Sequence, residues 1–158
     1  MEFAKRAVDA CVRAMQEGRA DEHKAQNILK CKQVDVTPIE PFLKHASSDI
    51  RFLAARIVGE KGNVKVLLEA ALKEQQTYIL VRMLRLLGSR KAEGIEAFEW
   101  LLKEDSDSDV KEAAIQMFRR AGKVDQLFPM IFDERDFVVQ RIKRYLNEQE
   151  QNREASDT

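Results

Sequence analysis

Apolar residues recur along the chain at positions i, i+3, i+4, i+7 and i+8, the spacing that gathers them on one stripe of an α-helix. Four anchor residues begin such stripes at intervals of 29, 31 and 28 residues: Ile50, Ile79, Val110 and Val138. A second series of stripes lies between them, with three anchors: Val64, Ile95 and Val124. Arg82, Glu99 and Arg141 are polar intrusions in these stripes. Two interleaved helix series with a period near 30 residues predict stacked antiparallel helix hairpins.

Capping residues support the same boundaries. Asp49 and Asp109 precede the first-series stripes as expected N-caps, because a side-chain oxygen there accepts hydrogen bonds from first-turn amides. Four glycines are expected as left-handed C-caps where first-series helices should end: Gly59, Gly62, Gly88 and Gly122. The turns at residues 61–63 and 88–90 are short enough to require antiparallel hairpins.

The first 46 residues show a weaker pattern. An amphipathic helix should end near Gly18, Asp21 should cap a second helix, and Pro38 should open a third after Thr37. We therefore expect one domain over residues 1–148. Residues 1–46 form a degenerate N-terminal repeat or cap and residues 47–148 form the regular repeats. The tail at 149–158 has no apolar stripe, so we expect it to be disordered and dispensable for thermal stability.

The predicted fold is all-helical, with nine or ten helices and no strand. Its buried stripe should contain twelve residues: Leu53, Ile57, Leu68, Leu72, Met83, Leu86, Leu102, Met117, Phe118, Leu127, Ile142 and Leu146.

Several short segments resemble a known repeat family. Residues 48–51, 54–55, 57–59, 62–63, 66–68 and 71–73 are similar to one HEAT-like repeat of the phycobilisome-lyase type, and residues 109–111, 113–114 and Gly122 repeat much of that unit. The resemblance covers roughly residues 47 to 147. It departs at the second unit, where Thr77-Tyr78-Ile79-Leu80 replaces the Asp-x-Arg opening.

The resemblance implies a right-handed α-α superhelix, a HEAT/armadillo-like solenoid, and is nearly silent about activity. Repeats of this type also occur in chromophore-attaching proteins, which makes a role as an accessory to such a lyase one alternative. No residue pattern identifies a chromophore pocket.

Composition removes several other classes of function. Lys and Arg total 27, as do Asp and Glu, so the zero net charge gives no global argument for binding nucleic acid or an anionic membrane. Cys11, Cys31, His23 and His45 have no metal-ligand or redox spacing, so we expect reduced thiols and no metal site. No nucleophile motif or phosphate loop is present, which predicts a protein without catalytic residues or cofactor. No stretch approaches the ~18 apolar residues of a membrane span, so a soluble cytoplasmic protein is expected.

The second-series helices carry the predicted binding face. Side chains one or five positions after an anchor point away from the buried stripe. Four such residues, with Glu104 and Met130 of the same series, form the predicted site for a protein or peptide partner: Lys65, Glu69, Glu96, Trp100, Glu104 and Met130. The acidic residues of this series favour a basic partner segment. Trp100 is either a surface anchor or, if its helix is slightly rotated, part of the core.

The alternative is nucleic-acid or polyanion binding through the first-series helices. Arg56, Arg85, Gln116 and Arg144 each lie six residues after an anchor and form a nearly basic column, to which Arg82 and Arg141 add. Salt bridges between oppositely charged layers would equally explain these arginines. Trp100 and Glu104, at i and i+4, faintly resemble the aromatic and acidic residues of HEAT-like alkylpurine DNA glycosylases. A lone tryptophan and zero net charge weigh against that activity.

Overall fold

The regular secondary structure is entirely helical in the residues that the structure, a computed structural model, describes: 2–90, 92–101 and 116–117. Six α-helices and one 3-10 helix are found there, which confirms the all-helical prediction for this part of the chain. They are α1 (Glu2–Gln16), α2 (Glu22–Leu29), η1 (Thr37–Lys44), α3 (Ser48–Lys61), α4 (Val64–Lys73), α5 (Thr77–Ser89) and α6 (Ala92–Leu101).

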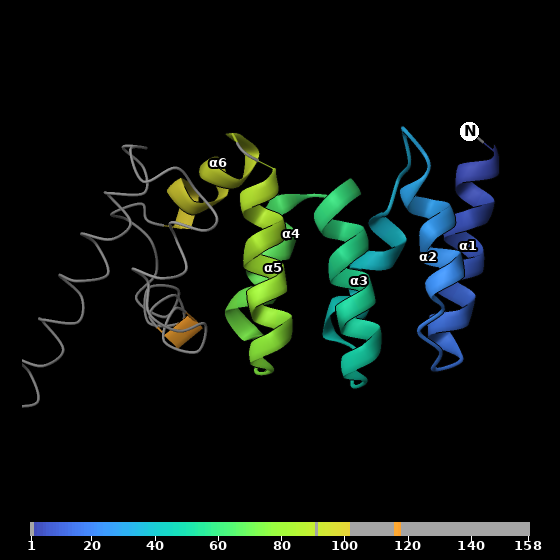
Figure 1. The fold of residues 1–158 in the computed structure, drawn as a ribbon, viewed down its shortest axis with the longest axis horizontal. Helices are drawn as coiled ribbons and strands as arrows, with labels where there is room; N and C mark the ends of the chain where they lie inside the picture. Colours follow the sequence, from blue (N-terminus) through green and yellow to red (C-terminus); the bar gives the residue numbers. More distant parts are fainter. Residues whose placement is uncertain (1, 91, 102–115, 118–158) are drawn as a thin grey trace, which may run out of the picture.

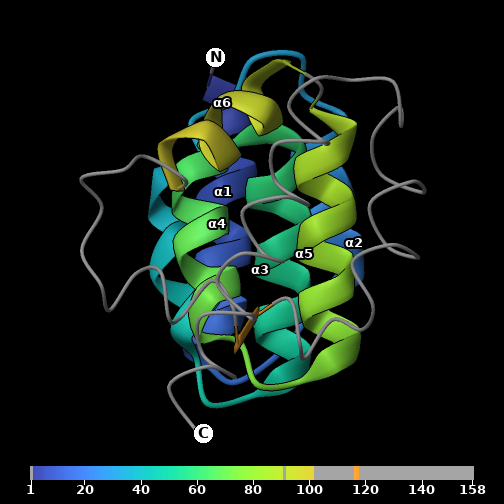
Figure 2. The ribbon, with the colours of Figure 1, turned by 90° about the vertical axis from the view of Figure 1, so that its left-hand side faces the viewer.

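The helices pack in two layers along the long axis of the molecule (Figure 1). In the first layer α2 contacts α3, and α3 contacts α5. In the second layer α1, η1, α4 and α6 contact one another in that order. Cross-layer contacts join α1 to α2, η1 to α3 and α4 to α5. Figure 2, which looks along the row, shows α4 and α5 side by side. The first layer thus holds the predicted first-series helices, and the second layer holds the second-series helices.

The apolar stripes become the interface between the layers. Six residues of the predicted stripe are buried, and a seventh, Leu72, is only partly buried; the six are Leu53, Ile57, Leu68, Met83, Leu86 and Met117. Leu72 was expected to be fully buried, and that expectation is wrong because the side chain packs at the edge of the core. The remaining stripe residues lie outside the described residues: Leu102, Phe118, Leu127, Ile142 and Leu146.

The second layer contains a 3-10 helix where the pattern predicts an α-helix. Pro38 opens η1 as expected, but Pro41 lies inside it. A proline in a helix interior has no N–H to donate and its ring clashes with the carbonyl of the preceding turn. An i→i+4 hydrogen-bond ladder is therefore broken here, and η1 keeps the tighter 3-10 geometry over its short length.

The observed caps correct several predicted ones. Asp21 caps α2 through a hydrogen bond from the Lys24 amide, as expected. The N-cap of α3 is Ser47, whose Oγ accepts from the Ile50 amide, while Asp49 lies inside the first turn. Asp49 was the wrong residue because Ser47 already occupies the extended backbone position from which an oxygen reaches that amide.

The predicted left-handed glycine caps are also wrong where the structure describes them. Gly62 ends α3 with φ of −113°, which is extended backbone, and Gly59 and Gly88 lie within helices. Among the described glycines, Gly18 has the one positive φ, 81°, just after α1 ends. Asp109 and Gly122 lie outside the described residues.

Burial of Cys11 makes the free energy of unfolding fall as the pH becomes alkaline. Its side chain is fully buried in α1, and burial, with a smaller effect of the Asp21 carboxylate, raises the pKa of the thiol from its ordinary 9.0 to about 11. Between pH 9 and pH 11 the Cys11 thiol therefore keeps its proton in the folded state, whereas the unfolded chain loses it. The contribution of this group to the free energy of unfolding is complete below pH 9 and is lost as pH rises towards 11. We expect a loss of ~2 kcal/mol from this group.

Urea unfolding at pH 8 and pH 11, with Cys11→Ala as the matched variant, isolates that contribution. The stability advantage of the wild type over Cys11→Ala should shrink by ~2 kcal/mol between the two pH values. An advantage that stays constant would show that the thiol titrates alike in both states.

Candidate binding grooves

A groove runs between η1 and α4 on the second layer. It has a volume of about 530 Å³ and is lined by Thr37, Glu40, Pro41, Leu43, Lys44, Val66, Glu69, Ala70 and Lys73. Leu43 and Ala70 are buried and Val66 is half-buried, whereas Lys44, Glu69 and Lys73 are exposed. The groove therefore has an apolar floor and a charged rim.

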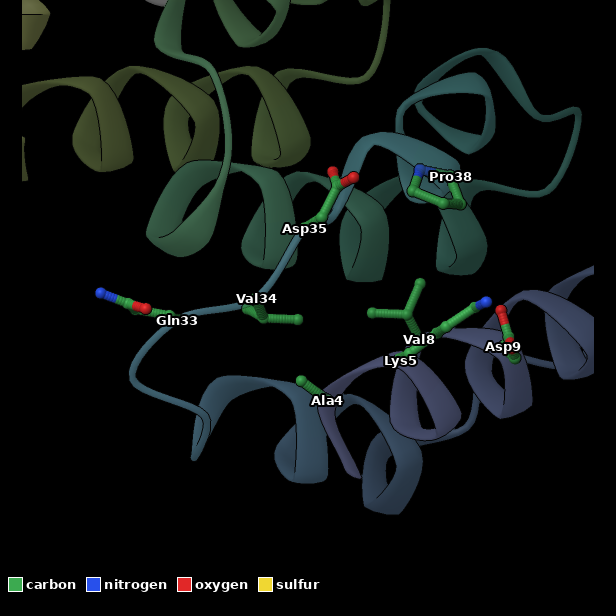
Figure 3. A pocket seen from close by; sticks show the side chains of 8 residues that line it. All are labelled: Ala4, Lys5, Val8, Asp9, Gln33, Val34, Asp35 and Pro38. Atoms are coloured by element: carbon green, nitrogen blue, oxygen red, sulfur yellow. The ribbon is translucent and has the colours of Figure 1, made fainter. Parts of the chain in front are cut away.

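A second groove, the α1–η1 groove, has a volume of about 510 Å³ and lies between α1 and residues 33–38, the segment that leads into η1. One wall is formed by Ala4, Lys5, Val8 and Asp9 of α1, and the other by Gln33, Val34, Asp35 and Pro38. Figure 3 shows Ala4, Val8 and Val34 turned towards the space between the walls, while Gln33 points away. The second layer thus carries two neighbouring grooves, one between η1 and α4 and one between α1 and the segment that leads into η1.

The residues that line the two walls of the η1–α4 groove follow the same spacing along the chain. Thr37, Glu40, Pro41 and Lys44 on η1 correspond, at a constant interval of 29 residues, to Val66, Glu69, Ala70 and Lys73 on α4. Short turns join η1 to α3 and α3 to α4, so η1 and α4 run in the same direction. Equivalent charges consequently lie at the same end of the groove.

The rim charges of this groove have no ion-pair partner among the described residues. Over the described ranges 2–90 and 92–101, neither the Glu40 and Glu69 carboxylates nor the Lys44 and Lys73 ammonium groups form an ion pair or side-chain hydrogen bond. These four groups are therefore hydrated, and a bound molecule can replace that water with direct contacts.

The structure places part of the predicted binding set on this layer. Lys65 and Glu69 on α4 and Glu96 on α6 are exposed, and Glu69 lines the η1–α4 groove. Trp100 lies in α6, but its side chain is not among those described. Glu104 and Met130 lie outside the described residues. Binding by these residues stays a prediction.

The basic column of the first layer is only partly free. Arg56 forms an ion pair with Glu22 of α2, with Nη1 3.1 Å from Oε2. Arg82 is half-buried and Arg85 is exposed, both on α5. Arg141 and Arg144 lie outside the described residues. Arg56 is therefore paired within its own layer, since α2 and α3 both belong to the first layer, and this pair is not one of the salt bridges between layers weighed for these arginines.

Sequence patterns missed two structural arginines. Arg51 pairs with Glu74 through Nε at 3.0 Å and Nη2 at 3.2 Å, and its Nη1 donates to the backbone oxygens of His45 and Ala46. Arg90 donates to the backbone oxygens of Gly59 and Gly62 at 3.1 and 2.9 Å, satisfying carbonyls at the end of α3. Both arginines join successive hairpins; Arg51 lies in the first turn of α3 and Arg90 in the predicted turn at residues 88–90.

Searches for other features and for relatives add three findings. Among the described residues, no helix is long and apolar enough to span a bilayer. In the same part of the chain no group of three or more His, Cys, Asp or Glu residues is placed to hold a metal ion. No protein-family model, curated protein or solved structure matches the sequence.

Proposed function

We propose that this protein is a non-catalytic binding scaffold, a HEAT-like solenoid, that recognises a protein or peptide partner through its second layer. The observation that supports the proposal is the pair of apolar-floored grooves on this layer, one between η1 and α4 and one between α1 and residues 33–38. In a stack of hairpins one face repeats similar grooves along its length, so a single partner can contact several repeats.

The chemistry of the grooves suits a polypeptide. An apolar floor offers burial area to one or two side chains, while a polar rim fixes their orientation. The rim charges of both signs make a uniformly charged polyanion a poor fit, because Glu40, Glu69 and Asp35 would repel it. The first layer provides the competing surface through Arg82 and Arg85.

Affinity capture with matched variants tests the choice of face. Val66→Arg places a charged side chain on the groove floor, and we expect it to weaken capture of a wild-type partner at least about tenfold. The control, Arg85→Glu, changes an exposed residue of the first layer and should leave capture unchanged. Trp100→Ala, measured alongside, tests the predicted anchor on α6.

Thermal unfolding of each variant separates lost binding from lost folding. Retained binding by Val66→Arg, combined with loss in Arg85→Glu or in an Arg85→Glu, Arg144→Glu double variant, would move the site to the first layer. Recovery of DNA or RNA by the wild type, with a strong dependence on salt, would favour the polyanion alternative.

A further inference from the structure

We propose that the η1–α4 groove binds an extended peptide segment in which one apolar residue is flanked by a basic residue on one side and an acidic residue on the other. The inference rests on the proposed function and specifies the partner for the same face. Its basis is the order of the rim charges, the apolar floor and the spacing between them.

The rim charges are segregated along the groove. Glu40 and Glu69 lie on the N-terminal sides of their wall elements relative to Lys44 and Lys73. Because η1 and α4 run in the same direction, one part of the groove carries both carboxylates and the next carries both ammonium groups. A bound segment gains most when its own charges are arranged in the opposite sense.

The separation of these charges matches an extended chain. Four residues span about 6 Å along an α-helix and about 8 Å along a 3-10 helix, so the carboxylates and ammonium groups are offset by roughly that distance. Two residues of an extended chain span about 7 Å. One residue therefore separates the basic from the acidic residue of the peptide.

The alternation of an extended chain places the middle residue on the floor. Successive side chains point to opposite sides, so when the central residue faces Leu43, Val66 and Ala70 its two neighbours lie at the level of the rim. The floor residues are apolar, which selects an apolar central side chain. The required segment is basic–apolar–acidic, read in either chain direction.

The α1–η1 groove lacks this arrangement. Lys5 and Asp9 lie on one wall, but the facing wall contributes Asp35 and no base. Its charges are therefore not matched in pairs across the groove. The proposal is confined to the groove between η1 and α4.

Selection from a random-peptide display library tests the inference without a known partner. The wild-type protein should enrich peptides with basic–apolar–acidic triplets. The Glu40→Lys, Glu69→Lys variant, whose rim is wholly basic, should instead enrich acidic–apolar–acidic triplets. The Lys44→Glu, Lys73→Glu variant should enrich basic–apolar–basic triplets, and each rim variant should bind wild-type-selected peptides about tenfold more weakly.

A matched control separates the groove from net charge. Glu2→Lys with Glu60→Lys changes the charge by the same amount as the wholly basic rim, at exposed residues outside the groove, and should enrich the wild-type triplet. Thermal unfolding of every variant, including the variant at half-buried Glu40, checks that the fold is kept. The inference is overturned if the rim variants enrich the same triplet as the wild type, or if the control variant changes the enriched triplet as much as the rim variants do.

Retesting the selected peptides on Val66→Arg distinguishes failure of the charge rule for this groove from failure of the proposed function. Peptides that require Val66 but lack the flanking charges leave the scaffold proposal standing and remove only the charge rule. Peptides that bind Val66→Arg and are lost with Arg85→Glu contradict both. If the wild type enriches no peptide, the groove does not take extended segments and the inference is wrong, whereas the scaffold proposal is decided by the capture experiment.

Discussion

Replacing Arg51 with alanine is expected to lower the free energy of unfolding by about 3–5 kcal/mol, because it leaves a buried carboxylate without its charged partner. The Glu74 side chain is only 3% exposed and its two oxygens accept from Arg51 Nε and Nη2. The same arginine donates to the His45 and Ala46 carbonyls, which would lose that partner as well. Urea unfolding followed by circular dichroism measures the loss.

The pair is structurally costly to break because it joins three segments. Arg51 lies in the first turn of α3, Glu74 ends α4, and the Glu74 Oε1 atom also accepts from the amide of Gln76, the N-cap residue of α5. Loss of the guanidinium therefore disturbs the junction between successive hairpins.

An exposed ion pair supplies the control for Arg51→Ala. Arg6 and Glu2 are four residues apart on α1, and their side chains are 80% and 87% exposed. Arg6→Ala should cost less than ~1 kcal/mol, as exposed pairs do. A cost for Arg51→Ala no larger than that for Arg6→Ala would contradict the assigned role.

Helix positions in the middle of the chain were predictable because their stripes are strongly periodic. The series anchored at Ile50, Val64 and Ile79 becomes α3, α4 and α5, and the short turn at residues 61–63 is where the pattern places it. Periodicity shows which side chains of each helix are buried, and in two packed layers of helices these buried faces largely determine how the helices are arranged.

Details that depend on contacts between distant segments were not predictable from periodicity. Gly59 has the residue type of a cap, but its position reflects the close approach of α5. Arg51 and Glu74 are 23 residues apart and lie outside any stripe. Pairing of this kind is decided by three-dimensional proximity, which a single sequence does not encode as a local pattern.

The candidate groove was half predictable. Counting five positions from Val64 placed Glu69 on an exposed face of the second series, and it lines the groove. The other wall was missed because Pro41 makes η1 irregular, so the common residue spacing of η1 and α4 was not recognised. The 29-residue interval between Glu40 and Glu69, and between Lys44 and Lys73, was the signal that would have revealed it.

Truncating Leu86 to alanine is the second change for which we expect a large effect, a loss of about 2–5 kcal/mol. Leu86 is 6% exposed on α5 and packs against α3 at Gly59, where an added Cβ would lie 2.8 Å from the Leu86 Cβ atom. Removing three side-chain carbons leaves a cavity between rigid helices. Leu72→Ala, at a partly buried position, should cost less. A loss below about half a kcal/mol for Leu86→Ala would show that the predicted register is wrong.

Gly59→Ala tests the same contact from the other side. Alanine is intrinsically favoured over glycine inside a helix by about 1 kcal/mol, so an unhindered site would be stabilised. At Gly59 the new methyl group would lie 2.8 Å from Leu86 Cδ1 as well as from Cβ, and α5 must move away to admit it. We therefore expect destabilisation. In the Gly59→Ala, Leu86→Ala double variant the Cδ1 and Cγ contacts are gone while the Cβ contact remains, so the combined loss should be smaller than the sum of the single losses. Additive losses, or a stabilised Gly59→Ala variant, would mean that α3 and α5 do not meet at these residues.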